Sequence, residues 1–500
     1  MCVKTFGLNP ASVITTAAGK FLVLAPNLDN TDILIQKLKE KISNAFHKRF
    51  YGEVNFSIAY LKAGTEAFDV KHFAPFMNKL SLKLEEAKLR PLALDAKLFV
   101  FNDYLEKIKS SDDVCAICAK RPKVKIMDEI AVCEDCLFFK EIGERLVKDD
   151  FIKIGKGLKY GIIGKFGFEF VKKEAVPETT LDIIYQLRTE EFYGYPLKYI
   201  ASYVPRFKDN EWKEEKYKSL QKEKLPKNQK VGDIKTFYHV ACDALTKKGG
   251  QWIGSKFLGV LKADVDNLGL IFREGLKRKE GHLLTISRYA YLSRMLDAFF
   301  SLYIPYVVTK KYPDIYTVFT GGDDLFIIGP YTQIYDFVKE EIGRQFKKYV
   351  CQNEDITLSA GLILSKPAVP VREMAEEAER MLEQAKDKGK DAISMFDKTL
   401  NWQEFLKLFE FEMEINTVEE IEKLPMAYFY RLLTFADWAE KMHKNPKFAK
   451  WRALFAYITA RNFGKKNYYE RLLSIADKWI EHYKSELIIP LSIAIYRRRK

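Results

Sequence analysis

The sequence predicts an α+β protein of several domains. The chain has 500 residues, of which 47% are hydrophobic, enough for roughly three to four separate cores. Strand-like and helix-like segments alternate over residues 251–400, whereas helical periodicity with many aromatic residues prevails from residue 401 onward. Two closely spaced cysteine pairs precede the central section. We therefore expect domains over residues 1–100, 101–250, 251–400 and 401–500.

The charge of the chain favours a polyanionic partner. Lys and Arg number 82 against 68 Asp and Glu, which gives a formal net charge of +14. This excess favours nucleic acid over a neutral small molecule as the partner. No apolar run approaches the length of about 18 residues that a membrane span needs, and the N-terminal MCVKTFGLNP lacks the apolar core of a secretory signal. We expect a cytoplasmic protein without membrane contact.

The N-terminal section mixes two kinds of pattern. Short apolar runs, KFLVLAP and VNFSIAYL, alternate with amphipathic stretches such as DILIQKLKEKISNAF. This combination predicts an α+β or α/β unit.

Four cysteines form a metal-binding pattern. Two C-x-x-C pairs, Cys115 with Cys118 and Cys133 with Cys136, are separated by 14 residues. Such pairs place four thiolates around one tetrahedral zinc ion, and a site closed by four sulfurs holds structure and performs no chemistry. The alternative is a redox pair or incidental cysteines, but a redox motif needs a single C-x-x-C. We predict a zinc ribbon in the linker section.

A charged run follows over residues 206–230, RFKDNEWKEEKYKSLQKEKLPKNQK. We interpret it as a solvated connector or mobile loop, since runs of this composition seldom bury.

Residues 251–400 carry the most regular pattern. KFLGVLKADVDNLG predicts a strand, and LLTISRYAYLSRMLDAFFSLYI a helix. DIYTVFT and LFIIG predict a hairpin; TQIYDFVKEEIGRQFKKYV, ITLSAGLIL and VREMAEEAERMLEQAKDKG predict a helix, a strand and a helix. The resulting order is that of a ferredoxin-like palm. The section from residue 401 predicts a helical domain whose aromatic residues mostly pack in its core.

Three acidic residues are candidates for catalysis. Asp323 and Asp324 lie at the hairpin tip, and Asp264 lies 59 residues before Asp323 at the end of the first strand. In a palm sheet these strands are neighbours, so the carboxylates could hold two Mg²⁺ or Mn²⁺ ions for nucleotidyl transfer. Gly321 and Gly322 would let a triphosphate approach the backbone. The alternative is an ordinary Gly-Asp turn beside a polar strand end.

These segments resemble a known family. KADVDNLG, FTGGDDLFIIG, ITLSAGLIL and AERMLEQAKDKGKDAI, in this order, resemble the cyclase domain of GGDEF-type diguanylate cyclases. They are still more similar to the second palm of the large subunit of type III CRISPR effector complexes. TTAAGKFLVLAPN resembles part of that subunit's first, degenerate palm, and CAIC…CEDC its zinc-bearing linker. The Csm (type III-A) branch is the most similar, over nearly the whole chain.

The resemblance implies an activity and site residues. Such a palm joins ATP into cyclic oligoadenylate, with Asp264, Asp323 and Asp324 holding the metals and Lys386 and Lys390 binding the triphosphate. The implied nucleotide-binding residues are Gly321, Gly322, Val265 (through its backbone), Asp266, Asn267, Lys386 and Lys390. The two lysines could equally be a solvated helix end. The choice of adenine rests on the resemblance alone.

The resemblance also implies partners. These are guide RNA paired with target RNA, the subunit that binds the guide handle, and the small helical subunit. The basic and aromatic C-terminal segments, FAKWRALFAYITARNFGKKNYYERLL and YRRRK, would face either solvent or RNA phosphates.

Three features depart from the family pattern. None of the six histidines is followed by aspartate, so we expect no HD nuclease in this chain. The chain begins inside the expected first palm, which suggests a truncated, split or shortened form. Asp391 stands where GGDEF cyclases often have Asn.

Two other functions compete with a synthetase. One is an assembly scaffold with a silent palm, against which the intact acids argue, because converging carboxylates repel one another without metal. The other is a stand-alone palm cyclase or polymerase, which would not need the zinc ribbon or the basic helical tail.

Overall fold

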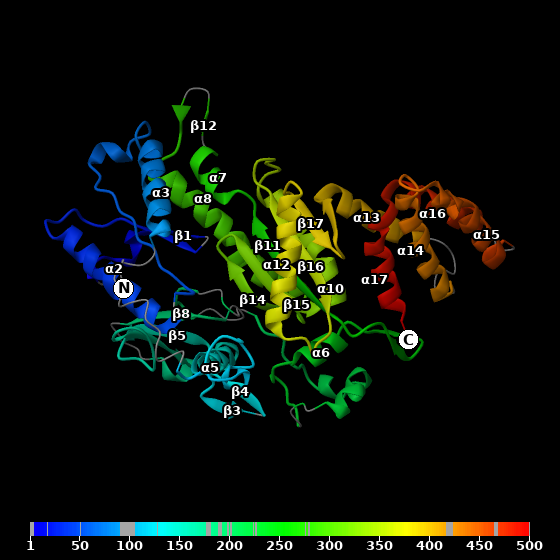
Figure 1. The fold of residues 1–500 in the computed structure, drawn as a ribbon, viewed down its shortest axis with the longest axis horizontal. Coiled ribbons are helices and arrows are strands. Elements are labelled where there is room, and N and C mark those ends of the chain that lie inside the picture. The colour runs from blue at the N-terminus through cyan, green and yellow to red at the C-terminus, as the bar shows by residue number, and fades with distance from the viewer. Residues whose placement is uncertain are drawn as a thin grey trace. The chain divides into compact units, whose positions relative to one another are not determined.

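A computed structural model of the chain describes residues 5–17, 19–50, 52–90, 106–127, 129–176, 182–188, 193–197, 200, 203–223, 225, 228–275, 277–278, 281–416, 424–464 and 469–499. The chain divides into two compact units, Met1–Ser202 with Gly269–Ala298, and Tyr203–Leu268 with Phe299–Lys500. Figure 1 labels the elements of both units.

The first unit begins with a short hairpin and two helices. These elements are β1 (Val13–Ala17), β2 (Lys20–Val23), α2 (Thr31–Phe50) and α3 (Phe73–Leu89). In α2 the buried Ile35, Leu38 and Ile42 recur at the spacing of one helix face. The run VNFSIAYL pairs with no strand among the described residues, although its alternation suggests one.

The middle of the first unit combines the cysteine pairs with a small sheet. Its elements are β3 (Lys125–Met127), β4 (Ile130–Val132), α5 (Glu134–Lys148), β5 (Phe151–Lys156), β6 (Tyr160–Ile163), β7 (Phe166–Val171) and β8 (Ile183–Gln186). The sheet is antiparallel in the order β6-β7-β5-β8. Aromatic residues form its core, where Tyr160 and Phe170 pack with Leu187.

The remainder of the first unit comes from a later part of the sequence. It contains α7 (Leu268–Glu274), the short strands β12 (Lys277–Arg278) and β13 (Gly281–His282), and α8 (Ile286–Ala298). Leu284 packs there against Phe73 and Ala74 of α3 in one buried cluster.

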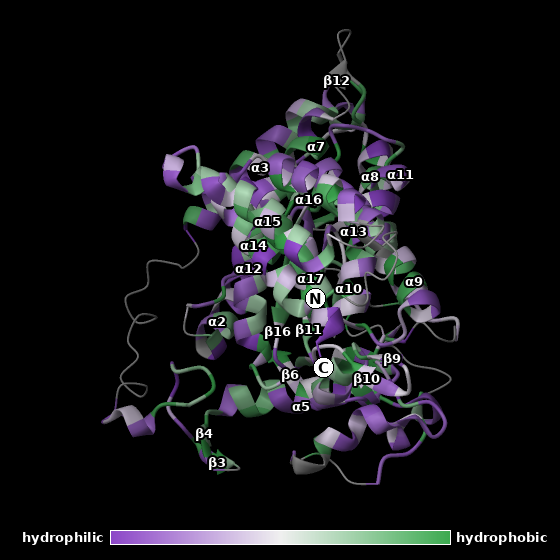
Figure 2. Cartoon of the chain, turned by 90° about the vertical axis from the view of Figure 1, so that its right-hand side faces the viewer, coloured by the Kyte–Doolittle hydropathy of each residue, from purple (hydrophilic) through white to green (hydrophobic). Residues whose placement is uncertain are grey.

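A six-stranded sheet in the order β14-β15-β11-β16-β17-β18 is the centre of the second unit. Its strands are β11 (Leu258–Val265), β14 (Tyr316–Gly321), β15 (Asp324–Pro330), β16 (Leu358–Ser365), β17 (Ala392–Met395) and β18 (Lys398–Asn401). Neighbouring strands are antiparallel except for the parallel pair β16–β17. The predicted strands and hairpin are confirmed, whereas β17 and β18 were not predicted. In Figure 2 the strands β11 and β16 are coloured mainly as hydrophobic, in keeping with their burial.

The helices around this sheet follow the predicted segments. They are a π-helical turn (Phe299–Tyr303), α9 (Ile304–Lys311), α10 (Tyr331–Phe337), a π-helical stretch (Val338–Gln345), α11 (Phe346–Tyr349) and α12 (Val371–Asp387). Helix α12 packs closely on β16 at Gly361, where a Cβ atom would lie 2.4 Å from the Ala378 carbonyl oxygen. Only glycine permits this approach.

The charged run over residues 206–230 is not the solvated connector that its composition suggests. It forms short 3₁₀ turns (Glu211–Lys213 and Glu215–Lys222) that lead to α6 (Phe237–Cys242), and Phe207 and Tyr217 are buried against Cys242. Residues 203–250, which the sequence alone places in the linker section, belong to the second unit.

A buried lysine explains why this charged segment folds. The ammonium of Lys235, fully buried, contacts Glu211 at 2.6 Å, Asp243 at 2.9 Å and Asp314 at 2.7 Å. Burial lowers the pKa of Lys235, but the charges of Asp243 and Asp314 outweigh it and raise the pKa above its usual value. The ion-pair partners are far apart in sequence, so no local pattern could reveal them.

The last part of the second unit is helical. It comprises α13 (Trp402–Asn416), α14 (Met426–Lys441), a 3₁₀ turn (Pro446–Lys450), α15 (Trp451–Phe463), α16 (Tyr469–Tyr483), a 3₁₀ turn (Lys484–Leu487) and α17 (Ile488–Arg498). As predicted, aromatic residues such as Phe405, Trp451 and Phe455 fill its core. Within the described ranges no helix combines the length and apolarity that crossing a membrane requires.

We predict that Lys235→Met lowers the free energy of unfolding of the second unit by about 3–5 kcal/mol, because the buried carboxylates lose one of their two cations and only Lys216 remains beside Glu211 and Asp243. Thermal melting followed by circular dichroism would measure the loss. Lys218→Met is the matched control, since that side chain is 66% exposed and its removal should cost no more than about 0.5 kcal/mol. Equal melting temperatures for both variants would contradict the role of Lys235.

Candidate active site

The register of the central sheet brings the predicted acids to one end. Asp264, near the end of β11, lies directly opposite Asp324, the first residue of β15. The turn before Asp324 contains Gly322 at φ +74°, a left-handed conformation that favours glycine. The backbone N–H of Val265 donates to the carbonyl of Asp323 at 2.9 Å. The hairpin tip is thus fastened to the end of the neighbouring strand.

The three carboxylates differ in environment. The Asp323 side chain is buried, whereas Asp324 is exposed at the tip of the turn. Desolvation by the surrounding protein, followed by the negative charges of Asp323 and Asp264, raises the pKa of Asp324 to about 7. Crowded carboxylates of this kind resist ionisation together unless a cation neutralises them.

Lys386 supplies a cation to one of these acids. Its ammonium on α12 lies 2.8 Å from Asp264, and both side chains are about one quarter exposed. Burial raises the pKa of Asp264, and the ion pair with Lys386 partly opposes that rise. Lys386, which is predicted to bind the triphosphate, is therefore ion-paired with Asp264, which is predicted to bind metal.

A second pair lies next to the first. Lys262, two residues before Asp264 on the same face of β11, contacts Glu379 of α12 at 2.6 Å and lies over the ring of Phe326. A cavity of about 330 Å³ opens here. It is lined by Lys262, Ala263, Asp264, Phe319, Asp324, Leu325, Phe326, Glu379, Leu382 and Lys386.

The sequence did not single out Lys262 or Glu379. The sequence could have indicated both residues. Lys262 lies two positions before Asp264 and so faces the same side of the strand, and Glu379 lies two helical turns before Lys386 on the same side of the helix. The pairing itself depends on how α12 crosses the sheet.

The carboxylates do not form a compact trio. Among the described residues, groups of three or more potential ligands within 4.8 Å of one another are the four cysteines and the set Glu211, Asp243 and Asp314. The second set already encloses the Lys235 ammonium. Asp264 and Asp324 nevertheless fit a hard divalent cation, because two paired strands place their carboxylates directly opposite each other.

Asp266, which the resemblance implies as a nucleotide-binding residue, is buried in a network of hydrogen bonds. Only 2% exposed, its carboxylate accepts hydrogen bonds from the hydroxyls of Thr357 at 2.8 Å and Ser359 at 2.7 Å. It also accepts from the backbone N–H of Asp391 at 2.9 Å. Asp266 thus anchors the loop after α12 to the start of β16.

That loop carries the second predicted lysine. Lys390 and Asp391 both adopt left-handed φ angles, of 69° and 47°. The Lys390 ammonium donates a short hydrogen bond to the side-chain oxygen of Asn267, which is itself left-handed at φ 53°. The predicted residues Asp266, Asn267 and Lys390 therefore belong to one hydrogen-bonded corner, joined through Asp391.

The four cysteines converge in the first unit. Their sulfurs all lie within 4.8 Å of one another, and those of Cys118 and Cys133 are 3.8 Å apart. A tetrahedral ion with zinc–sulfur bonds of about 2.3 Å separates its sulfurs by about 3.8 Å, so the cluster fits zinc. Burial raises the pKa of Cys115, but backbone N–H groups of Cys118, Cys133 and Ile117 outweigh it and bring the pKa to about 7. Burial raises the pKa of Cys133 and Cys136 above the usual value, so a cation is needed to hold all four sulfurs as thiolates.

Family models match two parts of the chain. The model described as Cas10/Cmr2, second palm domain, matches residues 257–394, which include every predicted metal-binding acid. The model described as Csm1 subunit domain B matches residues 1–103.

Curated relatives share one description, CRISPR system single-strand-specific deoxyribonuclease Cas10/Csm1 (subtype III-A). The relative from Methanocaldococcus jannaschii is 37% identical over 183 residues, which cover 32% of this chain and 22% of the relative. The relative from Streptococcus thermophilus is 25% identical over 521 residues, covering 99% of this chain and 62% of the relative. The chain therefore spans less than two thirds of the length of these relatives.

Solved structures share the fold. A Csm1–Csm4 cassette in complex with one ATP has a TM-score of 0.68 at 19% identity, and covers 99% of this chain and 64% of that chain. A Csm1–Csm4 subcomplex of the type III-A CRISPR-Csm interference complex has a TM-score of 0.67 at 20% identity, with the same coverage. A cassette in complex with cA4 has a TM-score of 0.65 at 19% identity, again covering 99% and 64%.

We predict that replacing Cys115 and Cys118 by Ser removes bound zinc and lowers the melting temperature of the first unit, because zinc binding contributes directly to folding in such small sites. Metal analysis and thermal melting would test this. Cys351→Ser is the control, since Cys351 is exposed and outside the cluster. Unchanged zinc content and melting in the double variant would refute the zinc site.

We predict that Asp266→Ala lowers the free energy of unfolding by at least about 2 kcal/mol, because hydrogen bonds to a charged acceptor are worth about 1.5–3 kcal/mol each. The backbone amide of Asp391 should also exchange faster with solvent. Asp355→Ala is the control, because that side chain is exposed. If both variants behave alike, Asp266 does not anchor the loop.

Proposed function

Since the chain belongs to the Cas10/Csm1 family of type III-A CRISPR systems, we propose that its central palm synthesises cyclic oligoadenylate from ATP. The observation that carries this proposal is the pairing of Asp264 with Asp324 across β11 and β15, beside a Gly-Gly-Asp-Asp turn. Solved Csm1 relatives bound to ATP and to cA4 support the choice of substrate and product.

The strand order supports a ferredoxin-like palm. Numbered along the chain, the four strands β11, β14, β15 and β16 stand in the spatial order second, third, first and fourth, all antiparallel. This is the order of the split β-α-β arrangement. It puts the end of the first strand beside the turn between the second and third, where Asp264 meets Asp324.

In the proposed reaction Asp264, Asp323 and Asp324 would hold two Mg²⁺ ions. When bound, such ions lower the pKa of an attacking ribose 3′-hydroxyl and neutralise the leaving pyrophosphate. Gly322 leaves the turn without a side chain, so that phosphates can approach the backbone.

Lys386 has two partners in this scheme. In the structure Lys386 pairs with Asp264. When a metal ion takes the place of the ammonium at Asp264, the Lys386 side chain would turn to contact the triphosphate. Lysine suits this exchange, because it binds phosphate as a point charge on a flexible stem. Lys390, held by Asn267, would meet the triphosphate from the loop after α12.

The other predicted components complete the proposal. The four cysteines would hold a structural zinc ion. The partners would be guide and target RNA and other Csm subunits, because the solved relatives include Csm1–Csm4 complexes. The excess of positive charge supports RNA as a partner.

One observation favours a silent scaffold as the second candidate. The pair between Lys386 and Asp264 supplies a cation inside the chain, so the acids are partly compensated without metal. Repulsion between the carboxylates is therefore smaller than their number suggests, and a scaffold without metal could tolerate them. The experiment below separates the two functions.

We predict that Asp323→Ala with Asp324→Ala lowers oligoadenylate synthesis at least about 100-fold, because the charge-stabilising groups of the transition state are lost. The assay incubates the chain, assembled with its guide complex and matching target RNA, with labelled ATP and Mg²⁺, and resolves the products by mass. Zinc content and RNA association should stay unchanged.

The matched control is Glu354→Ala with Asp355→Ala, which removes two exposed negative charges from the same unit. This variant should synthesise normally. Retained synthesis in the Asp323 and Asp324 variant would place the metal site elsewhere, and no synthesis by the unaltered assembly would favour the scaffold.

A further inference from the structure

Lys386 occupies the position of a cation at Asp264, one of the proposed metal ligands. Its ammonium lies 2.8 Å from the Asp264 carboxylate. Mg²⁺ binds carboxylate oxygens at about 2.0–2.1 Å, so a metal ion at Asp264 would stand close to an ammonium that had not moved. Two positive charges at such a distance repel each other strongly. A metal ion can therefore bind at Asp264 with full affinity only after the ammonium has left.

Glu383 gives the ammonium a second partner. It precedes Lys386 by three residues on α12, its carboxylate lies 3.4 Å from the same ammonium, and its side chain is 54% exposed. Because both residues belong to one helix, Lys386 can leave Asp264 and keep this contact while the backbone stays in place. Glu379, one turn earlier, already contacts Lys262 at 2.6 Å. Lys386 therefore has one partner on the sheet and one on its own helix.

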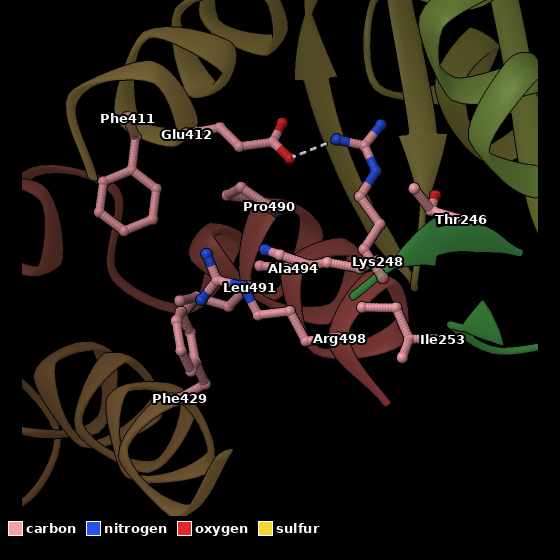
Figure 3. Close-up of a pocket in the computed structure, with 11 residues that line it drawn as sticks. Thr246, Lys248, Ile253, Phe411, Glu412, Phe429, Pro490, Leu491, Ala494 and Arg498 are labelled. Carbon is pink, nitrogen blue, oxygen red and sulfur yellow. Dashed lines mark hydrogen bonds and ion pairs between the residues drawn. The ribbon is translucent and has the colours of Figure 1, made fainter. Parts of the chain in front are cut away.

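The ion pairs of Arg497 in the same unit are of a different kind. Its guanidinium contacts Glu412 of α13 at 2.9 Å, the ion pair drawn at Glu412 in Figure 3, and Asp336 of α10 at 3.3 Å. It also lies 5.7 Å from the centre of the Tyr335 ring. A planar fork with these three contacts is oriented by all of them at once, whereas the ammonium of Lys386 is a point charge on a flexible stem.

Lys386 and the proposed metal ligands line one cavity. Asp264, Asp324 and Lys386 all belong to the cavity of about 330 Å³ at this end of the sheet. A triphosphate that enters with a metal ion would meet the displaced ammonium there, and its phosphate oxygens would replace the carboxylate as the partner of Lys386. Without a triphosphate, the ammonium loses its closest anion when a metal ion binds. One side chain thus makes the binding of metal and of triphosphate depend on each other.

We propose that Lys386 inhibits metal binding to the free chain, because it pairs with Asp264 and releases this carboxylate to a divalent ion when a nucleoside triphosphate supplies another anion. The inference rests on the proposed function, since it takes Asp264 as a metal ligand. It adds a form of regulation to that function: the free chain binds divalent metal weakly, and metal and nucleotide are taken up together.

The first test measures the binding of Mn²⁺ to the full chain without nucleotide, from the electron paramagnetic resonance signal of the free ion. Lys386→Met should raise the Mn²⁺ affinity about three- to fivefold, the range expected when a partly exposed ion pair no longer competes. Lys386→Arg keeps the positive charge and should bind Mn²⁺ no more tightly than the unaltered chain.

Lys388→Met is the matched control. Lys388 lies at the end of the same helix and is exposed, so its replacement changes the net charge equally without freeing Asp264. Its Mn²⁺ affinity should equal that of the unaltered chain. Equal Mn²⁺ affinities for Lys386→Met and Lys388→Met would overturn the inhibition by Lys386.

The second test titrates the preformed Mn²⁺ complex of α,β-methylene-ATP, an analogue that resists cleavage between its α- and β-phosphates, by calorimetry. Lys386→Met should weaken the binding of this complex several-fold, although the same variant binds Mn²⁺ alone more tightly. Lys388→Met should leave both affinities unchanged. A Lys386→Met variant whose two affinities change in the same direction would contradict the exchange of partners.

Asp264→Ala separates failure of this inference from failure of the proposed function. If Asp264→Ala loses Mn²⁺ binding while Lys386→Met gains none, the inhibition is wrong and the metal site stands. If Asp264→Ala binds Mn²⁺ as tightly as the unaltered chain, or if no variant binds Mn²⁺, the proposed metal site fails and the inhibition fails with it. Tighter Mn²⁺ binding in Lys386→Met that is lost when Asp264→Ala is added would support the inhibition.

Discussion

The close approach of α12 to β16 at Gly361 sets the geometry of the candidate site. A Cβ atom at this position would lie 2.4 Å from both the carbonyl oxygen of Ala378 and the amide nitrogen of Leu382. The helix can therefore lie directly on the sheet only above glycine. From there, its side chains at 379 and 386 reach Lys262 and Asp264 of β11, which pairs with β16. A helix displaced outward by a methyl group would weaken both ion pairs, because each spans less than 3 Å.

The register of the central sheet places acidic residues from different strands next to one another. Asp264 and Asp324 are 60 positions apart in sequence yet face each other across one ladder. Desolvation, and after it the negative charges of Asp323 and Asp264, raises the pKa of Asp324 to about 7. Below that pH the carboxyl is mostly protonated, and above it the charged form repels the neighbouring carboxylates, a repulsion that a cation would relieve. The site is thus prepared for a positive partner by its geometry.

The sequence predicted what depends on local patterns. Strand and helix periodicity placed β11, β14, β15, β16 and α12, and the two C-x-x-C pairs indicated a cluster whose sulfurs do converge. It did not predict β17 and β18, because four-residue strands show little alternation and α12 separates β17 in sequence from its parallel partner β16. It also misjudged the charged segment around Lys216, whose side chain is only 11% exposed. The position of Asp266 could not be foreseen either, since one donor to it, Asp391, comes 125 residues later.

Two ion-paired lysines in the second unit, Lys235 and Lys386, differ in how deeply they are buried, and burial determines how easily a lysine can leave its carboxylate partner. Glu211, Asp243 and Asp314 surround Lys235, whose side chain is inaccessible to solvent. Replacing that ammonium by a metal would require opening the core, so the pair is structural. Asp264 meets Lys386 in the same chemistry, but there about a quarter of each side chain is exposed. A partly exposed ammonium on a flexible stem can leave and be solvated at a smaller cost than the fully buried Lys235 ammonium. The same pairing of lysine with carboxylate is therefore fixed in one place, whereas at the end of the central sheet it is only partly buried, as the proposed exchange of Lys386 for a metal ion requires.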